Sequence, residues 1–310
     1  FLSGPFIDKY GRSLALKSVF FAYFIISISY FVFLSKEYIF ISRLFLGFFI
    51  GVEYVVSKTY ANECLDKKIK SKFITIIGLF WMVGISFSYI FGTAVVKNHE
   101  ILWNYLLVFP AIISIVGIFI RSFLNESLEW KESHLTSQIA QKHLEKISFL
   151  FKKGMFMRTI VATSIYLCHN VPFFAINTYL PSVLSNIFDK NSMINGIFYN
   201  IVLTIGSVAS VISIAFLKRR SLVLYSLFLQ SLFLLISSFS FMISPYATLI
   251  SLSLFALVLS GSSGVDFVYI PELFPTTLLG TGIGFTICLC RIITSFCTFF
   301  FPYILQKFGS

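Results

Sequence analysis

The amino-acid sequence predicts an all-α protein that crosses a membrane many times. Of its 310 residues, 57% are hydrophobic and 12% are charged, whereas a soluble domain carries roughly 25% charged residues. Apolar runs of the length that a bilayer requires, about 20 residues for a helix, recur along the chain. Lys and Arg gather between these runs. A compact water-soluble domain is excluded by this composition.

Nine apolar segments account for the predicted class, and each is long enough for one transmembrane helix. The longest run, 221–265, counts as two helices because Ser244 and Pro245 divide it. The predicted spans are 18–35, 38–60, 73–96, 101–120, 159–188, 191–217, the two parts of 221–265, and 278–305.

The positions of the basic residues predict the orientation. Loops on the cytoplasmic side of a membrane carry an excess of Lys and Arg. Most of the 24 basic residues fall in one alternate set of loops, and the other set holds Lys36, Lys97, Lys190 and Lys307. We therefore expect a multi-pass protein of the cell membrane with residue 1 on the cytoplasmic side.

A long polar segment separates the spans into two groups. Within it Leu135, Ile139, Leu144, Ile147 and Phe151 recur at helical spacing between charged residues. This pattern predicts either an amphipathic helix on the cytoplasmic surface or a helical linker that touches no lipid. The predicted organisation is an N-terminal half at 1–130, a cytoplasmic linker at 131–155 and a C-terminal half at 156–310.

A faint internal repeat supports two similar halves. Arg12 and Ser13 begin one span, and Arg220 and Ser221 begin another. Acidic residues end the following span in each copy, at Glu63 and Glu272. Parallel repeats of this kind are a known transporter architecture.

The first residues carry a motif. The segment 4–12, Gly-Pro-Phe-Ile-Asp-Lys-Tyr-Gly-Arg, resembles the G-x-x-x-D-[RK]-x-G-R signature of the major facilitator superfamily. Glycines suit a tight turn there, and Asp8 can accept the free amides of a helix N-terminus. Arg12 can pair with an acid on a neighbouring helix.

Other segments resemble the sugar and metabolite–proton symporter branches of this superfamily. They are 43–54 (the fourth helix), 125–130 (P-E-S-x-x-W, with Asn125 in place of Pro), 170–181 (the seventh helix) and 269–276 (P-E-x-F-P-T, between the tenth and eleventh helices). The resemblance implies a major facilitator fold in which nine transmembrane helices, the third to the eleventh, are present of an expected twelve. We interpret the start at Phe1 as a truncation.

Charges inside the spans are the first functional candidates, because each costs about 2.5–3.5 kcal/mol on insertion scales. Glu53 lies well inside its span and either binds protons during transport or is a structural hydrogen-bonded glutamate. The resemblance implies that Arg43 takes part in proton coupling or gating, since the matching Arg of proton–sugar symporters pairs with an acid on the first helix. Alternatively, Arg43 reaches the outer interface.

A second group of charges falls at cytoplasmic helix ends. As a set they could form salt bridges that hold one state of a transporter and break in the other. Ordinary interfacial charges are the alternative for each member. The predicted cytoplasmic gate is Asp8, Arg12, Glu63, Arg121 and Glu272.

Polar side chains in the second half are candidates for a substrate cavity. His169, Asn170 and Asn177 share one predicted helix, and the two asparagines lie on one face. They either line the cavity or bond between helices. Arg291, inside the last span, either forms a fork with an anionic group of a substrate or pairs with a neighbouring helix. For Asp266 we expect pairing at a gate first and substrate contact second.

Taken together, the motifs predict a secondary active transporter of a small polar organic solute, a sugar or an organic acid, coupled to protons and working by alternating access. A facilitated-diffusion uniporter and a transport-inactive relic remain alternatives. No enzyme motif, cofactor or metal site is predicted, and the five cysteines lack zinc spacing. The expected partners are substrate, protons and lipid, with no nucleic acid, and the expected state is a monomer.

Overall fold

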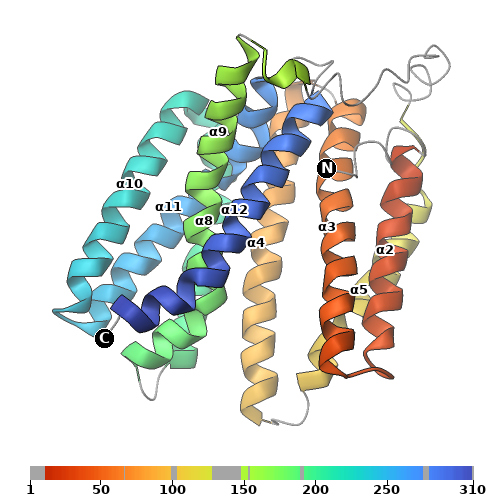
Figure 1. The fold of residues 1–310 in the computed structure, drawn as a ribbon. Helices are drawn as coiled ribbons and strands as arrows, with labels where there is room; N and C mark the ends of the chain where they lie inside the picture. Colours follow the sequence, from red (N-terminus) through yellow and green to blue (C-terminus); the bar gives the residue numbers. More distant parts are fainter. Residues whose placement is uncertain are drawn as a thin grey trace. The chain divides into compact units, whose positions relative to one another are not determined.

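The computed structural model describes residues 11–65, 67–98, 103–127, 148–152, 154–188, 192–274 and 279–308. Within these ranges the chain forms long α-helices and no β-strand (Figure 1). The predicted gate residue Asp8 and most of the predicted linker 131–155 lie outside them. The helices are α2 (Arg12–Ser29), α3 (Lys36–Cys64), α4 (Lys67–Asn98), α5 (Trp103–Ser122), α8 (Met155–Ile187), α9 (Ser192–Phe216), α10 (Arg219–Phe241), α11 (Pro245–Glu272) and α12 (Leu279–Phe308).

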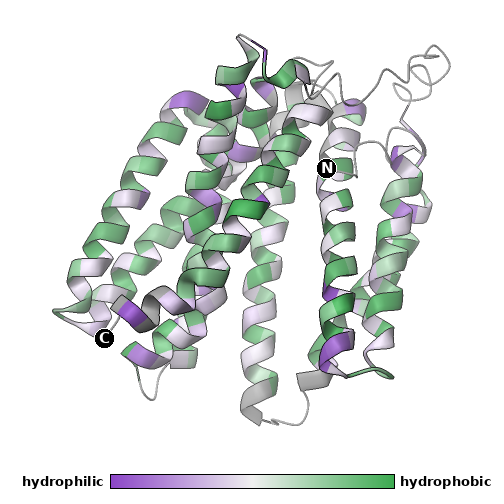
Figure 2. Ribbon diagram, in the orientation of Figure 1, coloured by the Kyte–Doolittle hydropathy of each residue, from purple (hydrophilic) through white to green (hydrophobic). Residues whose placement is uncertain are grey.

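The predicted all-α membrane class is confirmed. In the described ranges, nine helices are long and apolar enough to cross a membrane. Hydrophobic residues cover their length, and hydrophilic ones lie mostly toward their ends (Figure 2). A helix satisfies its own backbone groups, which is why helices can cross a bilayer that offers no hydrogen bonds.

The first helix begins and ends earlier than the predicted span 18–35. It starts at Arg12, directly after Gly11, whose φ of 93° favours glycine. It ends at Ser29, and residues 30–34 lead to α3, where the Ser35 hydroxyl accepts the amide of Tyr38 at 3.2 Å. The cause of the early start is a cap from a distant residue, described below.

The helices belong to two compact units, which we describe separately. The first unit comprises residues 1–70 and 91–147, and the second comprises 71–90 and 148–310. In the first, α2 packs on α3 and α5, with Ala15, Leu16 and Val19 buried against valines of α3.

The second unit contains α8–α12 and the central part of α4. Its core includes Phe173, Tyr199, Leu203 and Phe255, all nearly inaccessible. Residues 71–90, which we predicted within the N-terminal half, pack with this unit instead.

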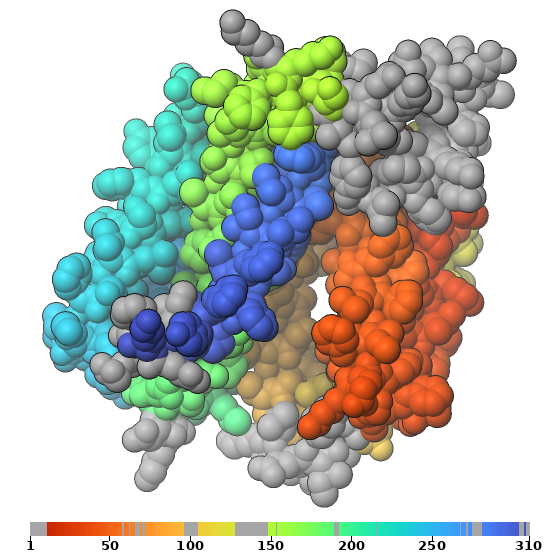
Figure 3. Space-filling model, viewed as in Figure 1, coloured from red at the N-terminus to blue at the C-terminus, as the bar shows by residue number. Residues whose placement is uncertain are grey.

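The outer face of the second unit is apolar. Along α10, exposed Leu224, Phe228, Leu235 and Phe239 recur at helical spacing, and α10 and α12 form much of the surface seen in Figure 3. Such a stripe is suited to contact with lipid chains.

One close helix approach depends on a glycine. At Gly206 of α9, an added Cβ would overlap the Ser260 hydroxyl and come within 2.5 Å of the Leu257 carbonyl oxygen on α11. At Gly47 of α3, by contrast, an added Cβ meets nothing within 4 Å.

We therefore expect Gly206→Ala to destabilise the protein by about 1–3 kcal/mol, because backbone cannot yield as a flexible side chain does. Denaturant titration of the purified protein in mixed micelles would measure the loss. Gly47→Ala is the matched control and should be neutral or slightly stabilising. Equal stability of the two variants would contradict the close α9–α11 contact.

Candidate functional site

A glutamate from the 125–130 motif holds the beginning of α2. Glu126 Oε1 accepts the backbone amide of Arg12 at 2.8 Å, and Oε2 accepts that of Ser13 at 3.0 Å. The Ser13 hydroxyl donates to the Leu124 carbonyl at 2.9 Å. A carboxylate suits this position because free amides and the helix dipole both favour negative charge there. The motif at 125–130 gave no indication in the sequence that Glu126 caps this helix.

The predicted gate residues Arg12 and Glu63 form an ion pair. The guanidinium of Arg12 lies 3.2 Å from Glu63 Oε1, which joins the start of α2 to the end of α3. Both side chains are mostly buried. The proposed pairing of Arg12 with an acid on an adjacent helix is therefore present.

The second unit contains a comparable pair. Glu272, the last residue of α11, forms an ion pair with Arg219, the first residue of α10. The internal repeat predicted Arg220 as the counterpart of Arg12, but in the structure the neighbouring residue Arg219 pairs with Glu272. This pair is more exposed, with 37% and 45% of the two side chains accessible, so it contributes less to stability.

Arg121 was predicted as a gate residue, but in the structure it lies beside Glu53. Its Nη2 is 2.6 Å from Glu53 Oε1, and its Nη1 donates to the Leu16 carbonyl at 2.9 Å. The guanidinium stacks on the Phe20 ring, 3.9 Å from the centroid. The Tyr23 hydroxyl donates to the other Glu53 oxygen at 2.9 Å.

Each oxygen of Glu53 thus has a donor, and the cluster ties α2, α3 and α5 together. Chemically, a proton on Glu53 would weaken its bond to Arg121. Arg43, the other predicted coupling residue, is exposed on α3 about 15 Å from Glu53 along the helix. The structure does not bring these two residues together.

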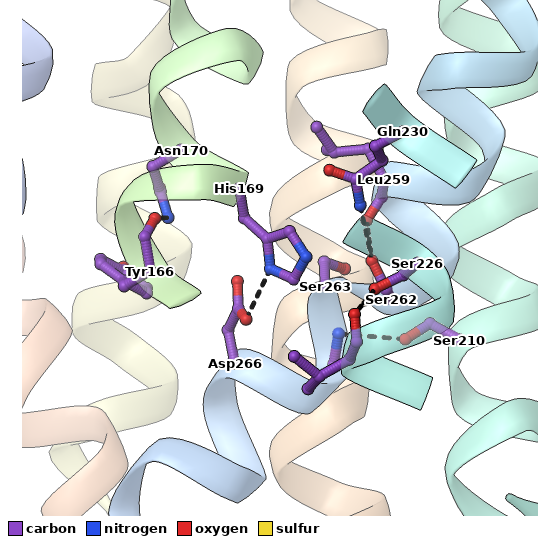
Figure 4. A network of polar contacts seen from close by, with 12 residues as sticks. Tyr166, His169, Asn170, Ser210, Ser226, Gln230, Leu259, Ser262, Ser263 and Asp266 are labelled. Atoms are coloured by element: carbon purple, nitrogen blue, oxygen red, sulfur yellow. Dashed lines mark hydrogen bonds and ion pairs between the residues drawn. The ribbon is translucent and has the colours of Figure 1, made fainter. Parts of the chain in front are cut away.

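In the second unit, His169 of α8 points at Asp266 of α11 (Figure 4). Nδ1 lies 2.7 Å from Asp266 Oδ1, and the two side chains are 4% and 8% accessible. From the sequence, His169 was predicted in a substrate cavity and Asp266 at a gate, and nothing in the sequence linked the two residues.

The two asparagines predicted in the substrate cavity form hydrogen bonds within their own helix, α8. Asn170 Nδ2 donates to the Tyr166 carbonyl at 2.8 Å, and Asn177 Nδ2 donates to the Phe173 carbonyl at 2.9 Å. The structure therefore satisfies one donor of each amide within α8.

A pocket of about 280 Å³ opens between α8 and α12. Arg291 is the one predicted cavity residue that lines it, and its guanidinium stacks over the Phe174 ring at 4.6 Å from the centroid. The Tyr179 hydroxyl donates to the Thr298 carbonyl at 3.0 Å. The hydroxyls that line the pocket belong to Thr178, Tyr179, Thr294, Ser295 and Thr298. A cation, hydroxyls and an aromatic face suit a small carboxylate or polyol.

Comparison with known proteins identifies the family. Residues 1–310 match the family described as sugar (and other) transporter. The chain belongs to this family. The sugar (and other) transporter family is part of the major facilitator superfamily, so the resemblance inferred from the motifs is confirmed. Its members are transporters rather than enzymes.

Individual relatives are distant. YgcS of Escherichia coli K12, named an inner membrane metabolite transport protein, is 22% identical over 86% of this chain and 64% of its own length. YdjE of the same organism, with the same description, is 27% identical over 52% of this chain and 36% of its own length. The chain thus spans less than two thirds of the length of YgcS.

Solved structures confirm the major facilitator fold. A D-xylose–proton symporter matches with a TM-score of 0.75 and 16% identity, covering 97% of this chain and 75% of that one. The inward open conformation of the xylose transporter XylE from E. coli matches with a TM-score of 0.73, 17% identity and the same coverage. The nine described helices fit part of a twelve-helix fold.

The contact between Glu53 and Arg121 can be tested by a double-mutant cycle. We expect Arg121→Gln to destabilise the protein, because it leaves a partly buried carboxylate without its cation, and Glu53→Gln to restore part of the loss. The coupling energy should be about 1 kcal/mol or more, measured by denaturant titration in mixed micelles.

The matched control is the same cycle with Arg219→Gln and Glu272→Gln, whose exposed pair should show a smaller coupling energy. Additive effects of the Arg121 and Glu53 substitutions would mean that their contact contributes no stability.

Proposed function

We propose that the whole protein is a secondary active transporter that carries a small polar organic solute, a sugar or an organic acid, together with protons by alternating access. The observation that carries this proposal is the pocket at Arg291, a cation within a membrane span that faces hydroxyls and an aromatic ring. Membership of a transporter family supports it. Bacterial relatives named as inner membrane proteins support the cell membrane as its location.

Within this proposal Glu53 is the proton-coupling residue of the first unit. Protonation would remove its charge and release Arg121, which would loosen the junction of α3 and α5. Arg43 is exposed in this chain, and we propose that it acts with an acid elsewhere in the whole protein. Residue 1 lies on the cytoplasmic side in this proposal, as the basic loops predict.

The ion pairs at helix ends are proposed to act in gating. Arg12–Glu63 and Arg219–Glu272 each join consecutive helices of one unit. Within this proposal the pairs hold one state of the alternating-access cycle and break in the other. Asp8 and Arg121 complete the proposed set.

The direct test is uptake by the full-length protein in liposomes, with a panel of labelled sugars and organic acids. We expect accumulation when an inward proton gradient is imposed and little without it. Equal uptake in both conditions would make the protein a uniporter, and no uptake of any member would favour the transport-inactive alternative. Glu53→Gln should abolish the gradient effect, and a normal response would remove the coupling role of Glu53.

Arg291 should decide which panel members bind. For a carboxylate substrate, Arg291→Lys should raise KM about tenfold or more, because the point charge of Lys cannot replace the two-pronged guanidinium contact. A neutral sugar should be affected much less. Lys307, a basic residue near the end of the same helix, is exposed and lies outside the pocket lining, so Lys307→Gln is the control. Unchanged KM in Arg291→Lys would exclude Arg291 from substrate binding.

A further inference from the structure

The structure points to a second titratable site, and we propose that His169 and Asp266 together bind one proton and link its presence to the pocket between α8 and α12. This inference rests on the proposed proton-coupled transport. It assigns a proton site to the second unit, whereas Glu53 belongs to the first.

The first observation is the geometry of the pair. Two ionisable side chains from different helices lie 2.7 Å apart in the interior of the second unit. A carboxylate that accepts from Nδ1–H fixes the imidazole tautomer and leaves a lone pair on Nε2. In that state the buried pair has a net charge of −1, which is costly away from water.

The second observation is the free nitrogen. His169 Nε2 is buried and has no hydrogen-bond partner among the residues that the structure describes. A proton that adds to Nε2 converts the imidazole to an imidazolium, and the net charge of the pair changes from −1 to zero. The Nδ1–Asp266 hydrogen bond persists and becomes a contact between opposite charges. The same proton can leave from Nε2 when water reaches it.

Among the side chains that the structure describes around the pair, few others are titratable. On α12, Cys290 interacts electrostatically with both Asp266 and Arg291. On α9 and α10, the polar groups near the pair in Figure 4 are Ser210, Ser226 and Gln230, none of which titrates near neutral pH. The part of α4 that packs here presents Thr75 beside Gly264 and Trp81 beside Phe173. Tyr166 lies on the same helix as His169, and Tyr269 lies on the same helix as Asp266.

A short physical path joins the pair to the pocket. The Tyr166 carbonyl, three residues before His169, accepts from Asn170 at 2.8 Å and from the Cys290 thiol at 3.7 Å. Arg291 follows Cys290 directly. The helix turn that carries His169 therefore touches the helix turn that carries the pocket arginine.

Helix α8 can also bend at this point. Pro172 lies inside the helix, three residues after His169, and it removes the backbone hydrogen bond to the Cys168 carbonyl. Phe174, Thr178 and Tyr179 of the pocket lie beyond this proline. A stronger His169–Asp266 contact would fix the first part of α8 against α11 and so alter the angle at which the second part meets α12.

The test begins with a full-length protein in which His169 is the only imidazole. The sequence has 4 histidines, so His99→Gln, His134→Gln and His143→Gln are introduced together, and any further histidine of the full-length protein is replaced likewise. Isotope-labelled histidine then reports the protonation of His169 by NMR in nanodiscs. We expect one protonation step of the imidazole over the pH range in which the protein stays folded, and a changed midpoint in Asp266→Asn. A signal that stays constant over this range would overturn the proposal.

Transport provides the second arm, with a panel substrate that the wild type accumulates. Asp266→Asn should reduce gradient-driven accumulation to the level seen without a gradient, while exchange of labelled for unlabelled substrate continues, which also shows that the variant is folded. Glu37→Gln, which removes an exposed carboxylate from the first turn of α3, should leave accumulation unchanged. Normal accumulation by Asp266→Asn would overturn the link to transport.

The two arms separate this inference from the proposed function. If the wild type shows no gradient-driven uptake, the proposed proton coupling fails before any variant is tested. The NMR titration then still decides whether His169 and Asp266 bind a proton: a step supports the site, and its absence overturns it.

Discussion

A charge within a membrane span is costly unless it is paired, and much of the arrangement of these helices follows from that constraint. A helix satisfies its own backbone but not its charged side chains. Arg121 is therefore surrounded by Glu53, a backbone carbonyl and an aromatic ring, and Asp266 is held against His169. Each contact joins different helices, so it also fixes which faces of those helices pack together.

Local patterns in the sequence predicted the spans well because hydrophobicity and helix length are local properties. The exception, α2, shows the limit of such patterns. Its first turn is capped by Glu126, more than a hundred residues away, and no property of residues 12–18 indicates that cap. The shift of the repeat from Arg220 to Arg219 has a similar origin, since the choice depends on which side chain reaches Glu272.

The sequence supplied candidate residues for the site but not their contacts. The cost of a charge in hydrocarbon made Glu53 and Arg291 candidates without any structure. Helical periodicity predicted Asn170 and Asn177 on one face, but it could not show that both amides bond to carbonyls of α8. The pairing of His169 with Asp266 joins residues 97 positions apart. Helical spacing predicts contacts only between residues a few positions apart, so it could not predict this pair.

Glu53 and Asp266 differ in what a proton would do to their contacts. On Glu53 a proton competes with Arg121 and would separate α3 from α5. On His169 Nε2 a proton leaves the bond to Asp266 in place and adds an attraction between opposite charges, which would hold α8 and α11 closer. Proton uptake would therefore relax the helix contacts of one unit and tighten those of the other. Such opposite responses would allow one proton gradient to favour different conformations of the two units at the same step of a transport cycle.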